Sequence, residues 1–541
     1  MNIQEKIDLW KSANLPADLA EQLEKLSQAE LEDAFYQDII FGTAGMRGTM
    51  GVGSNRINLI TIAQTTKALA NHMIADGVDK QGVVISFDSR NNSNLFAKTA
   101  AEILSAVDIP VYLFDSPHPT PELSFAVRHL QTYAGIMITA SHNPKEDNGY
   151  KLYGTDGGQL PPDAAEKIIA ERQKLLSTFE IEQMDNGIKM IGEDIDQEYL
   201  KNVKSISLNQ ELINQSGDQL KLAFTPLHGA GGNLTISALK QAGFSNVTVV
   251  AEQFEPNGDF PTVKKPNPED SNVFALAEQT NLPVLIAIDP DGDRMGIAVK
   301  VADQYQVLTG NQIATLILDY LSTHQNSFNN PALVTSNVSS LMPTAIGKKR
   351  GIDSFVVHTG FKWIADTIKN FENSNQHQFI FGFEESYGYL IKPFVRDKDA
   401  IQATLLMSEI VLNYQLENKT VIDRLEELYQ EFGYYSELTL AIDFEGESGQ
   451  LEMQTIIEKL RANPIEEISD FKVEKYIDFS KEKPAANLLR YQLENDGWFA
   501  IRPSGTEPKL KIYLGVVGSD AANAKNKLDQ LEKAVRAIIR G

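Results

Sequence analysis

The chain has 541 residues, which is too long for one hydrophobic core and predicts about three to four domains. Zero cysteines exclude disulfides, a thiolate nucleophile and sulfur-bound zinc, so any metal is expected to have oxygen ligands. The 49 Lys and Arg against 73 Asp and Glu give a net charge of -24, which argues against nucleic acid or an anionic membrane as a partner. Because the start of the chain is charged and no apolar run reaches about 18 residues, we expect a cytoplasmic protein.

The first 40 residues combine leucines with many charges, a pattern that predicts amphipathic helices. The sequence F-G-T-A-G-M-R-G (residues 41–48) follows and places Arg47 among three glycines. Glycines let the backbone approach a ligand, and a guanidinium presents a planar set of donors to a phosphate. Predicted helices at 60–75 and 96–106 then alternate with predicted strands at 82–87 and 111–114. This alternation predicts a first domain built from β–α units.

A serine lies where the next strand ends. The apolar run 134–138 predicts a buried strand, and T-A-S-H-N-P-K-E-D-N-G-Y-K (139–151) follows it with turn residues. Ser141 therefore lies at the point where a strand opens into a loop. A serine hydroxyl reacts only with help from a base, a metal or donors, and His142 and Lys151 are at hand. The alternative is an ordinary Ser-His-Asn-Pro turn.

Three aspartates follow a second apolar strand. The acidic stretch 164–208 predicts helices without site chemistry, and a new alternating segment begins at 220, where His228 is interpreted as a hydrogen-bonded turn residue. The apolar run 284–288 then predicts a buried parallel strand that ends in Asp289, Asp291 and Asp293. Carboxylates this close repel one another unless a cation neutralises them, and oxygen ligands suit Mg²⁺. The alternative is a solvated acidic turn, and the spacing does not match an EF-hand.

Two loops of the third α/β segment carry sugar-binding chemistry. The segment begins near 309 and leads to H-T-G-F-K-W (358–363) and to F-I-F-G-F-E-E-S-Y-G-Y (379–389). Glu384 and Ser386 follow an apolar strand there, and a carboxylate beside a hydroxyl suits neighbouring sugar hydroxyls. The alternative is a pair of surface residues in a turn. Lys398 follows in V-R-D-K-D-A (395–400).

The last segment, from about 432, contains W-F-A-I-R-P-S-G-T-E-P-K-L-K-I-Y-L (498–514). Arg502, Ser504 and Thr506 lie together between two predicted strands and form a set of donors that suits a phosphate dianion. An amphipathic helix is predicted at 521–539.

These motifs, in this order and over nearly the full chain, resemble the α-D-phosphohexomutase family. T-A-S-H-N-P, D-P-D-G-D-R, G-F-E-E-S and R-P-S-G-T-E-P carry the resemblance to its phosphoglucomutase and phosphomannomutase members, in the branch with phosphopentomutase-type relatives. The resemblance implies an α/β chain with three similar mixed-sheet domains and a smaller α+β C-terminal domain around a central cleft. We expect the phosphoserine domain at 1–208, the metal domain at 209–308, the sugar domain at 309–425 and the phosphate domain at 426–541.

The resemblance also implies roles for single residues. Ser141 would carry the phosphoryl group and, with Asp289, Asp291 and Asp293, hold one Mg²⁺ per chain. Arg47, His142 and Lys151 would handle phosphoryl and proton transfer. The substrate would contact Arg294, Thr359, Gly360, Lys362, Glu384, Ser386, Lys398, Arg502, Ser504, Gly505 and Thr506. The sugar loop reads G-F-E-E-S-Y-G where the family often has G-E-E-S-G, which leaves the choice of hexose open.

The expected activity is that of a phosphoglucomutase, which interconverts glucose 1-phosphate and glucose 6-phosphate through a phosphoserine and glucose 1,6-bisphosphate. We expect a phosphosugar as the only partner and a monomer or weak dimer. A phosphomannomutase or phosphopentomutase of the same family is the nearest alternative. A metal-dependent phosphatase would not need the second phosphate anchor at Arg502, and a catalytically silent sugar-phosphate sensor would not need Ser141 and Lys151.

Overall fold

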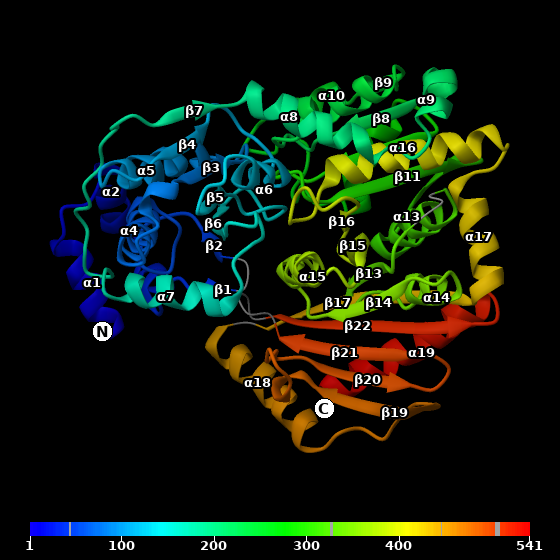
Figure 1. The fold of residues 1–541 in the computed structure, drawn as a ribbon. Coiled ribbons are helices and arrows are strands. Elements are labelled where there is room, and N and C mark those ends of the chain that lie inside the picture. The colour runs from blue at the N-terminus through cyan, green and yellow to red at the C-terminus, as the bar shows by residue number, and fades with distance from the viewer. Residues whose placement is uncertain (43–44, 325–327, 445, 504–508, 541) are drawn as a thin grey trace.

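The described chain is organised around four sheets, each with its own helices. A computed structural model describes residues 1–42, 45–324, 328–444, 446–503 and 509–540. Figure 1 shows the first sheet on the left, the second and third on the right, and the fourth below them. Three sheets mix parallel and antiparallel strands, and the fourth is antiparallel throughout the described residues. The predicted fold class is therefore confirmed.

The first unit is built on a seven-stranded sheet. Its strands are β1 (Phe41–Gly42), β2 (Gly45–Thr49), β3 (Val83–Phe87), β4 (Val111–Phe114), β5 (Ala134–Ile138), β6 (Asp147–Tyr153) and β7 (Lys189–Ile191). They lie in the order β1-β2-β6-β5-β3-β4-β7. The central parallel strands β3 and β5 are apolar along their length and buried on both faces, as strands covered by helices on both sides must be.

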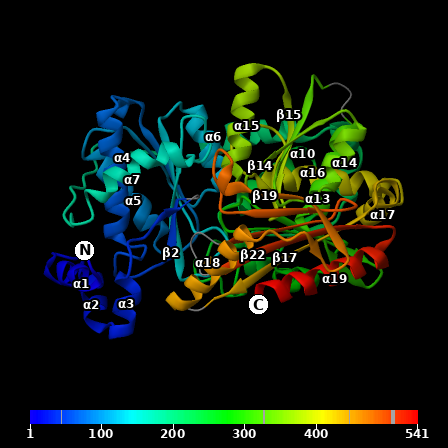
Figure 2. The ribbon, with the colours of Figure 1, turned by 90° about the horizontal axis from the view of Figure 1, so that it is seen from below.

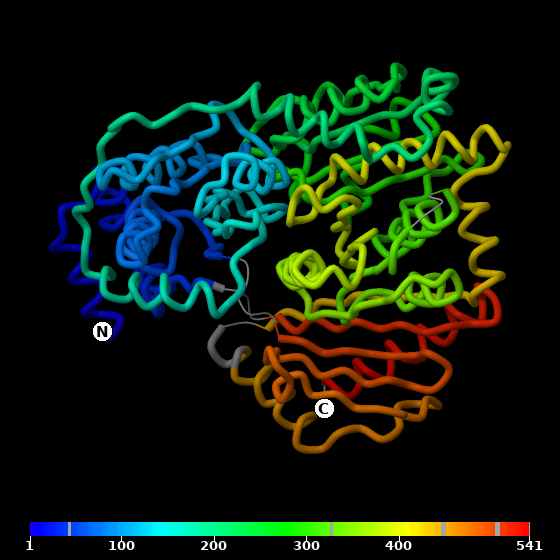
Figure 3. Tube along the Cα trace, in the orientation of Figure 1, coloured from blue at the N-terminus to red at the C-terminus, as the bar shows by residue number. Residues whose placement is uncertain are grey.

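The helices of the first unit cover this sheet and one outer edge. They are α1 (Ile3–Ser12), α2 (Ala17–Lys25), α3 (Gln28–Phe35), α4 (Leu59–Ala75), α5 (Ser93–Ser105), α6 (Thr120–His129), α7 (Pro162–Gln173) and α8 (Glu193–Val203). Helices α1 to α3 confirm the predicted helical start and pack a small core of their own around Trp10 and Phe35 at the outer edge of the molecule (Figure 2). After α7 the chain runs around the outside of the first sheet to β7 and α8 (Figure 3).

Four strands of this unit were not predicted: β1 and β2, in the glycine-rich stretch that was interpreted as a turn, and β6 and β7 further along the chain. Strand β6 returns antiparallel to β5 and pairs Lys151 with Met137, so Lys151 lies on a strand and not in the loop after Ser141. The expectation of helices alone over 164–208 is wrong at β7, which adds three residues to the edge of the sheet beside β4. A short edge strand has no apolar alternation of its own to reveal it, because its pairing is decided by the neighbouring strand.

The second and third units follow in similar form. The second has strands β8 (Leu222–Thr225), β9 (Val247–Val249), β10 (Val284–Ile288), β11 (Met295–Val301) and β12 (Gln304–Val307), with helices α9 (Gln210–Ser216), α10 (Gly232–Ala242), α11 (Ala251–Phe254) and α12 (Ala275–Glu278). The third has β13 (Pro331–Ser336), β14 (Asp353–Val357), β15 (Gln378–Glu384) and β16 (Gly388–Leu390), with α13 (Gly310–His324), α14 (Met342–Lys349), α15 (Phe361–Ser374), α16 (Ala400–Leu416) and α17 (Val421–Phe432).

One continuous hydrophobic core joins the first three units. It runs from Phe125 in α6 and Tyr199 in α8 through Ile286 in β10 to Leu405 in α16. Helix α16 is buried on all sides from residue 400 to 414 and is mostly apolar, as expected of a helix inside a large protein. The strand order is β12-β11-β10-β8-β9 in the second sheet and β14-β13-β15-β16 in the third. Near the centre of each sheet lies a strand with a parallel neighbour: β10 runs parallel to β8, and β13 runs parallel to β14 and β15.

The fourth unit has a core of its own. Its strands are β17 (Tyr434–Asp443), β18 (Glu467–Ile468), β19 (Phe471–Asp478), β20 (Leu489–Leu493), β21 (Trp498–Pro503) and β22 (Lys509–Gly518), and its helices are α18 (Gly446–Ala462) and α19 (Ala521–Arg540). The amphipathic α19 buries Leu531 and Val535 in that core. A small second cluster, in which Val338 meets Trp498, packs the fourth unit against the third.

Short 3-10 turns complete the described secondary structure, namely η1 (Asp79–Gln81), η2 (Lys204–Ile206), η3 (Gly217–Gln219), η4 (Ser271–Phe274) and η5 (Phe479–Lys481). Among the helices that the structure describes, none combines the length and the apolar character required to span a bilayer.

Candidate active site

Ser141 lies directly after β5 in a backbone conformation that few residues adopt. Its φ is 54°, in the left-handed region, which costs a residue with a side chain about 1 kcal/mol or more. Its N–H donates to Thr139 Oγ1 at 2.7 Å, and Thr139 Oγ1 in turn donates to Asp88 Oδ2 at 2.6 Å. The residue is 3% exposed. The surrounding structure therefore holds this hydroxyl in one orientation.

Arg90 is the main support of the Ser141 loop. It lies just after β3, which neighbours β5, and its side chain is buried. The guanidinium pairs with Asp88 Oδ2 at 3.2 Å and donates to four backbone carbonyls of the loop. These are the carbonyls of Ser141, Asn143, Pro144 and Asp147, at 2.5, 2.6, 2.8 and 3.1 Å. Sequence reasoning did not assign Arg90 a role.

The three predicted aspartates meet Ser141. Ser141 Oγ donates to Asp289 Oδ2 at 2.9 Å, and Asp289 Oδ1 accepts from the N–H of Asp293 at 3.0 Å. Carboxylate oxygens of Asp289, Asp291 and Asp293 lie within 4.8 Å of one another, and all three residues are buried. The strand β10, which directly precedes them, has the bounds that the sequence predicted.

This triad fits a divalent cation. Oδ1 of Asp291 and Oδ1 of Asp293 are buried and accept no hydrogen bond from the described residues. Burial, followed by the charges of Asp291 and Asp293, raises the pKa of Asp289 well above its usual range. Unpaired buried carboxylate oxygens with this mutual repulsion are the donor set that Mg²⁺ requires.

Two lysines reach the triad from different units. Lys151 Nζ, from the first unit, lies 2.8 Å from Asp291 Oδ2 and 3.7 Å from Asp293 Oδ2. Lys398 Nζ, from the third unit, lies 3.0 Å from Asp293 Oδ2 and 3.0 Å from Asp397 Oδ1. The Ser141 loop, the triad and both lysines thus form one connected group.

His142 and two arginines surround this group. The Nδ1 atom of His142 lies 3.0 Å from Ser141 Oγ. Burial, followed by Arg294 and Arg47, lowers the pKa of His142 well below its usual range, so the imidazole is neutral at pH 7. Arg47 Nη1 donates to Asn143 Oδ1 at 3.3 Å, and Arg294 Nη1 pairs with Glu269 Oε1 at 2.7 Å.

The sugar-binding residues predicted in the third unit lie beside the loop of the three aspartates. The main chain pairs Arg294 with Gly388 in an isolated bridge, which brings the residues after the triad next to the loop of Glu384 and Ser386. Glu384 ends β15 and accepts the N–H of Gly360 at 2.7 Å. Ser386 is half-buried in the turn that follows.

Arg502 joins the fourth unit to the third. Its Nη1 donates to Thr359 Oγ1 at 3.1 Å. Burial, followed by the charge of Arg502, lowers the pKa of Lys362 to about 8. Two cations therefore lie near Thr359, and one of them, Arg502, was predicted to bind the non-reacting phosphate. Ser504, Gly505 and Thr506, which were predicted to complete that site, lie outside the described residues.

Thr120 is a further residue that sequence reasoning missed. It begins α6, and its Oγ1 donates to Asp291 Oδ2 at 3.0 Å while its N–H donates to the Asp291 carbonyl at 2.8 Å. A threonine at the start of a helix is ordinarily a capping residue. No local pattern therefore indicated that this one bonds to the aspartate triad, 171 residues away.

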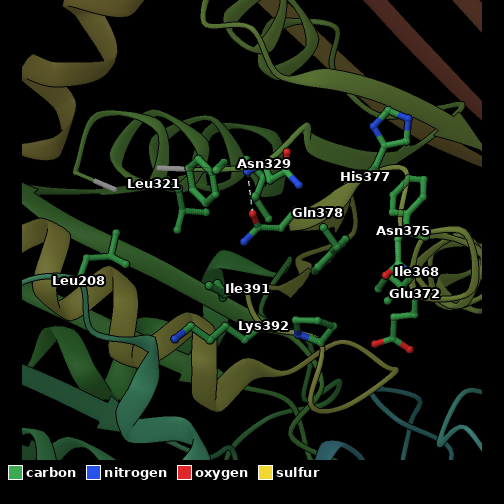
Figure 4. A pocket seen from close by; sticks show the side chains of 15 residues that line it. Leu208, Leu321, Asn329, Ile368, Glu372, Asn375, His377, Gln378, Ile391 and Lys392 are labelled. Carbon is green, nitrogen blue, oxygen red and sulfur yellow. Dashed lines mark hydrogen bonds between the residues drawn. The ribbon is translucent and has the colours of Figure 1, made fainter. Parts of the chain in front are cut away.

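The molecule also has a separate cavity of about 490 Å³ in the third unit (Figure 4). Leu208, Leu321, Ile368 and Lys392 contribute to its wall, together with Asn329 and Gln378, which hydrogen-bond each other there. None of its lining residues belongs to the predicted site. The chemistry of the site therefore lies between units and not in this hollow.

Known proteins share the sequence and the fold. Four models described as phosphoglucomutase/phosphomannomutase domains I, II, III and C-terminal match residues 38–178, 197–302, 309–432 and 472–532. A phosphoglucomutase of Staphylococcus aureus (strain MRSA252) is 35% identical over 533 residues, or 94% of this chain and 95% of that protein. A phosphoglucomutase of Staphylococcus epidermidis is 36% identical over 512 residues, or 90% and 92%.

Solved structures agree at the level of the fold. A putative phosphomannomutase from Thermus thermophilus has a TM-score of 0.73 at 21% identity, and the match covers 93% of this chain and all of that one (100%). The open form of the Paramecium phosphoglucomutase pp63/parafusin has a TM-score of 0.72 at 19% identity, covering 93% and 95%. With family models matching every unit and relatives over almost its whole length, the chain belongs to the phosphoglucomutase/phosphomannomutase family of isomerases.

Proposed function

We propose that the chain is a phosphoglucomutase that interconverts glucose 1-phosphate and glucose 6-phosphate through phospho-Ser141 and glucose 1,6-bisphosphate. The contact between Ser141 Oγ and Asp289 Oδ2, at 2.9 Å, is the observation that carries the proposal. It puts a buried hydroxyl next to a triad that fits a cation, so a phosphoryl group on Ser141 would meet positive charge. The relatives named phosphoglucomutase support glucose as the sugar.

Asp289, Asp291 and Asp293 would hold Mg²⁺ together with the phosphate on Ser141. When bound, the ion neutralises charge that develops on the transferring phosphoryl group. Arg47 and Lys398 add fixed positive charge around the same point, since phosphoryl transfer depends on positioning and on charge stabilisation.

The proposed transfer exchanges one P–O bond for another. The bond from phosphorus to Ser141 Oγ breaks as a sugar hydroxyl oxygen bonds to phosphorus, and the hydroxyl proton passes to a base. Two residues of the chain are candidates for that base. His142 is neutral and adjoins Ser141 Oγ, and Lys151, on β6, contacts Asp291 of the neighbouring triad. The bisphosphate then turns around, and its other phosphate returns to Ser141 by the reverse step.

The second end of the sugar phosphate has its own proposed site. Glu384 and Ser386 would hold sugar hydroxyls, with Gly360 fixing the Glu384 carboxylate. Arg502, Thr359 and Lys362 would hold the non-reacting phosphate together with Ser504, Gly505 and Thr506. A phosphate bound there would link the fourth unit to the third, which would help exclude water from the reaction.

Turnover of a panel of 1-phosphosugars tests the substrate. Glucose, mannose, glucosamine and ribose 1-phosphates are assayed with Mg²⁺ and a catalytic amount of glucose 1,6-bisphosphate. We expect the highest kcat/KM with glucose 1-phosphate. A higher value with mannose or ribose 1-phosphate would establish the phosphomannomutase or phosphopentomutase alternative instead. Release of inorganic phosphate would indicate a phosphatase.

The covalent intermediate is tested by mass spectrometry. After incubation with glucose 1,6-bisphosphate, we expect an added mass of about 80 Da on Ser141, the mass of one phosphoryl group. Ser141→Ala should lose this addition and its turnover while melting at the same temperature as the parent. Binding of phosphosugar without phosphorylation or turnover would favour a sensor. The domain limits at 208, 308 and 425, the cytoplasmic location and the monomer or weak dimer stay predictions.

A further inference from the structure

A second group of metal-ligand side chains lies outside the aspartate triad. His118, Glu122 and Asp196 place one ligand atom each within 4.8 Å of the others. His118 lies in the loop between β4 and α6, Glu122 lies in the first turn of α6, and Asp196 lies in the first turn of α8. Three segments of the first unit thus converge on one point.

The imidazole of His118 is oriented as a ligand. Its Nδ1 lies 2.8 Å from the carbonyl oxygen of Ser116, an acceptor, so Nδ1 carries a hydrogen and donates. In the neutral ring the lone pair is then on Nε2. That atom faces Asp196 Oδ1 at 3.1 Å, another acceptor. A carbonyl that accepts the Nδ1 hydrogen, and so leaves Nε2 for a ligand, is the arrangement seen around metal-bound histidines.

Glu122 supplies an independent sign of a missing partner. The residue is 0% exposed, and neither of its carboxylate oxygens accepts a hydrogen bond from any described residue. After burial, the charge of Asp196 and a side-chain hydrogen bond with Asp196 raise the pKa of Glu122 well above its usual range, followed by the charges of Asp399 and Asp115. Two carboxyl groups that face each other in a buried place must share a proton or a cation, because two bare negative charges repel. A cation between Glu122 and Asp196 would satisfy both.

We propose that His118 Nε2 and the carboxylates of Glu122 and Asp196 bind a divalent transition-metal ion. This site is separate from the aspartate triad at Ser141. One imidazole with two carboxylates suits Zn²⁺ and its neighbours in the first transition row, whereas Mg²⁺ prefers oxygen alone. Water would complete the coordination, because the Asp196 side chain is 28% exposed.

The ion would have a structural role. It would tie α6 to α8, the helix through which the chain leaves the first unit. Helix α6 begins at Thr120, which holds Asp291 of the catalytic triad. Helix α8 is also anchored further along, where Tyr199 donates to Asp399 Oδ2 at 2.8 Å. Occupation of the site should therefore raise the stability of the junction between units without taking part in phosphoryl transfer.

Zinc binding to the full-length protein tests the site. The protein is stripped with EDTA, kept in excess Mg²⁺ and titrated with Zn²⁺ by calorimetry, and bound zinc is counted by mass spectrometry after desalting. We expect His118→Gln and Glu122→Gln each to bind one Zn²⁺ fewer per chain than the parent, or to bind it more than about 10-fold more weakly. His129→Gln is the matched control, because His129 lies on α6 with Glu122, stacks on Phe125 and does not belong to the cluster.

Two further readouts separate this site from the triad. X-ray absorption of the zinc protein should show imidazole scattering in the parent and in His129→Gln, and less of it in His118→Gln. Zinc should raise the melting temperature of the same two proteins and leave that of Glu122→Gln unchanged. Equal zinc binding by parent, His118→Gln and Glu122→Gln would overturn the proposal, and so would a parent that binds no zinc. Glu122→Gln preserves size and shape, which keeps the test open if His118→Gln folds poorly.

Discussion

Replacing Arg90 tests whether the Ser141 loop depends on one buried guanidinium. Arg90→Met keeps much of the side-chain volume but removes the four donors to the loop carbonyls and the ion pair with Asp88. Ser141 then keeps its left-handed backbone without the bonds that enforce it. We expect the substitution to reduce both stability and turnover.

The magnitude can be worked out in two ways. Four hydrogen bonds at about 1 kcal/mol each give about 4 kcal/mol. Removing one partner of a buried ion pair costs about 3 to 5 kcal/mol, because the other charge is left uncompensated. The two figures describe overlapping losses and are not added. We therefore expect the free energy of unfolding to fall by about 4 kcal/mol, and kcat to fall by about 100-fold if the hydroxyl moves by about 1 Å.

Urea unfolding and steady-state turnover measure the two effects. Arg172→Met is the matched control, because Arg172 is also buried in the first unit but donates to the carbonyl of Ile39, away from Ser141. It should lose stability and keep its turnover per folded molecule. Removing the second charge as well, in Asp88→Asn with Arg90→Met, should recover part of the lost stability. The reasoning is refuted if Arg90→Met unfolds within about 1 kcal/mol of the parent and turns over at the parental rate.

Three other predictions follow from the site. Asp291→Asn should weaken Mg²⁺ binding more than about 10-fold by calorimetry, and unchanged affinity would remove the triad from the metal site. Lys362, with its pKa at about 8, is charged below that pH and neutral above it, so kcat/KM should fall as the pH rises through about 8. Lys362→Arg should abolish this alkaline decline, and a decline that persists would assign it to another group. In Gly149→Ala, the new Cβ would lie 2.5 Å from the Thr139 carbonyl oxygen and 2.7 Å from that of Met46, so the backbone around Ser141 must shift. We expect a loss of about 1 to 3 kcal/mol in urea unfolding, and parental stability would contradict the packing.

The sequence predicted most accurately those features of the fold that a single strand and the turn after it determine. The apolar runs before Ser141 and before the aspartates became β5 and β10 with the predicted bounds, because continuous apolar strands are recognisable without their neighbours. The carboxyl ends of parallel strands then bring side chains to one edge of each sheet.

The sequence did not predict contacts that depend on how strands and units are placed beside one another. Arg90 reaches the Ser141 loop across 51 residues, and Thr120 reaches Asp291 across 171. Neither residue has a local pattern that marks it out. Lys151 was predicted near the site for its spacing from Ser141, but its place on β6 follows from the return of that strand along β5.

The distribution of the hydrophobic cores has a mechanical consequence. Units one to three share continuous apolar packing, whereas the fourth has a separate core. It meets the third through the small cluster around Val338 and Trp498, through Tyr435 at the edge of the shared core and through polar contacts such as that of Arg502 with Thr359. The proposed reversal of the bisphosphate needs space, and moving the fourth unit would leave the buried residues of the core shared by the other three units together. The chain enters that unit at Gly433, whose φ of 103° few other residues tolerate. Rotation about this single joint would leave the aspartates, Ser141 and both lysines undisturbed.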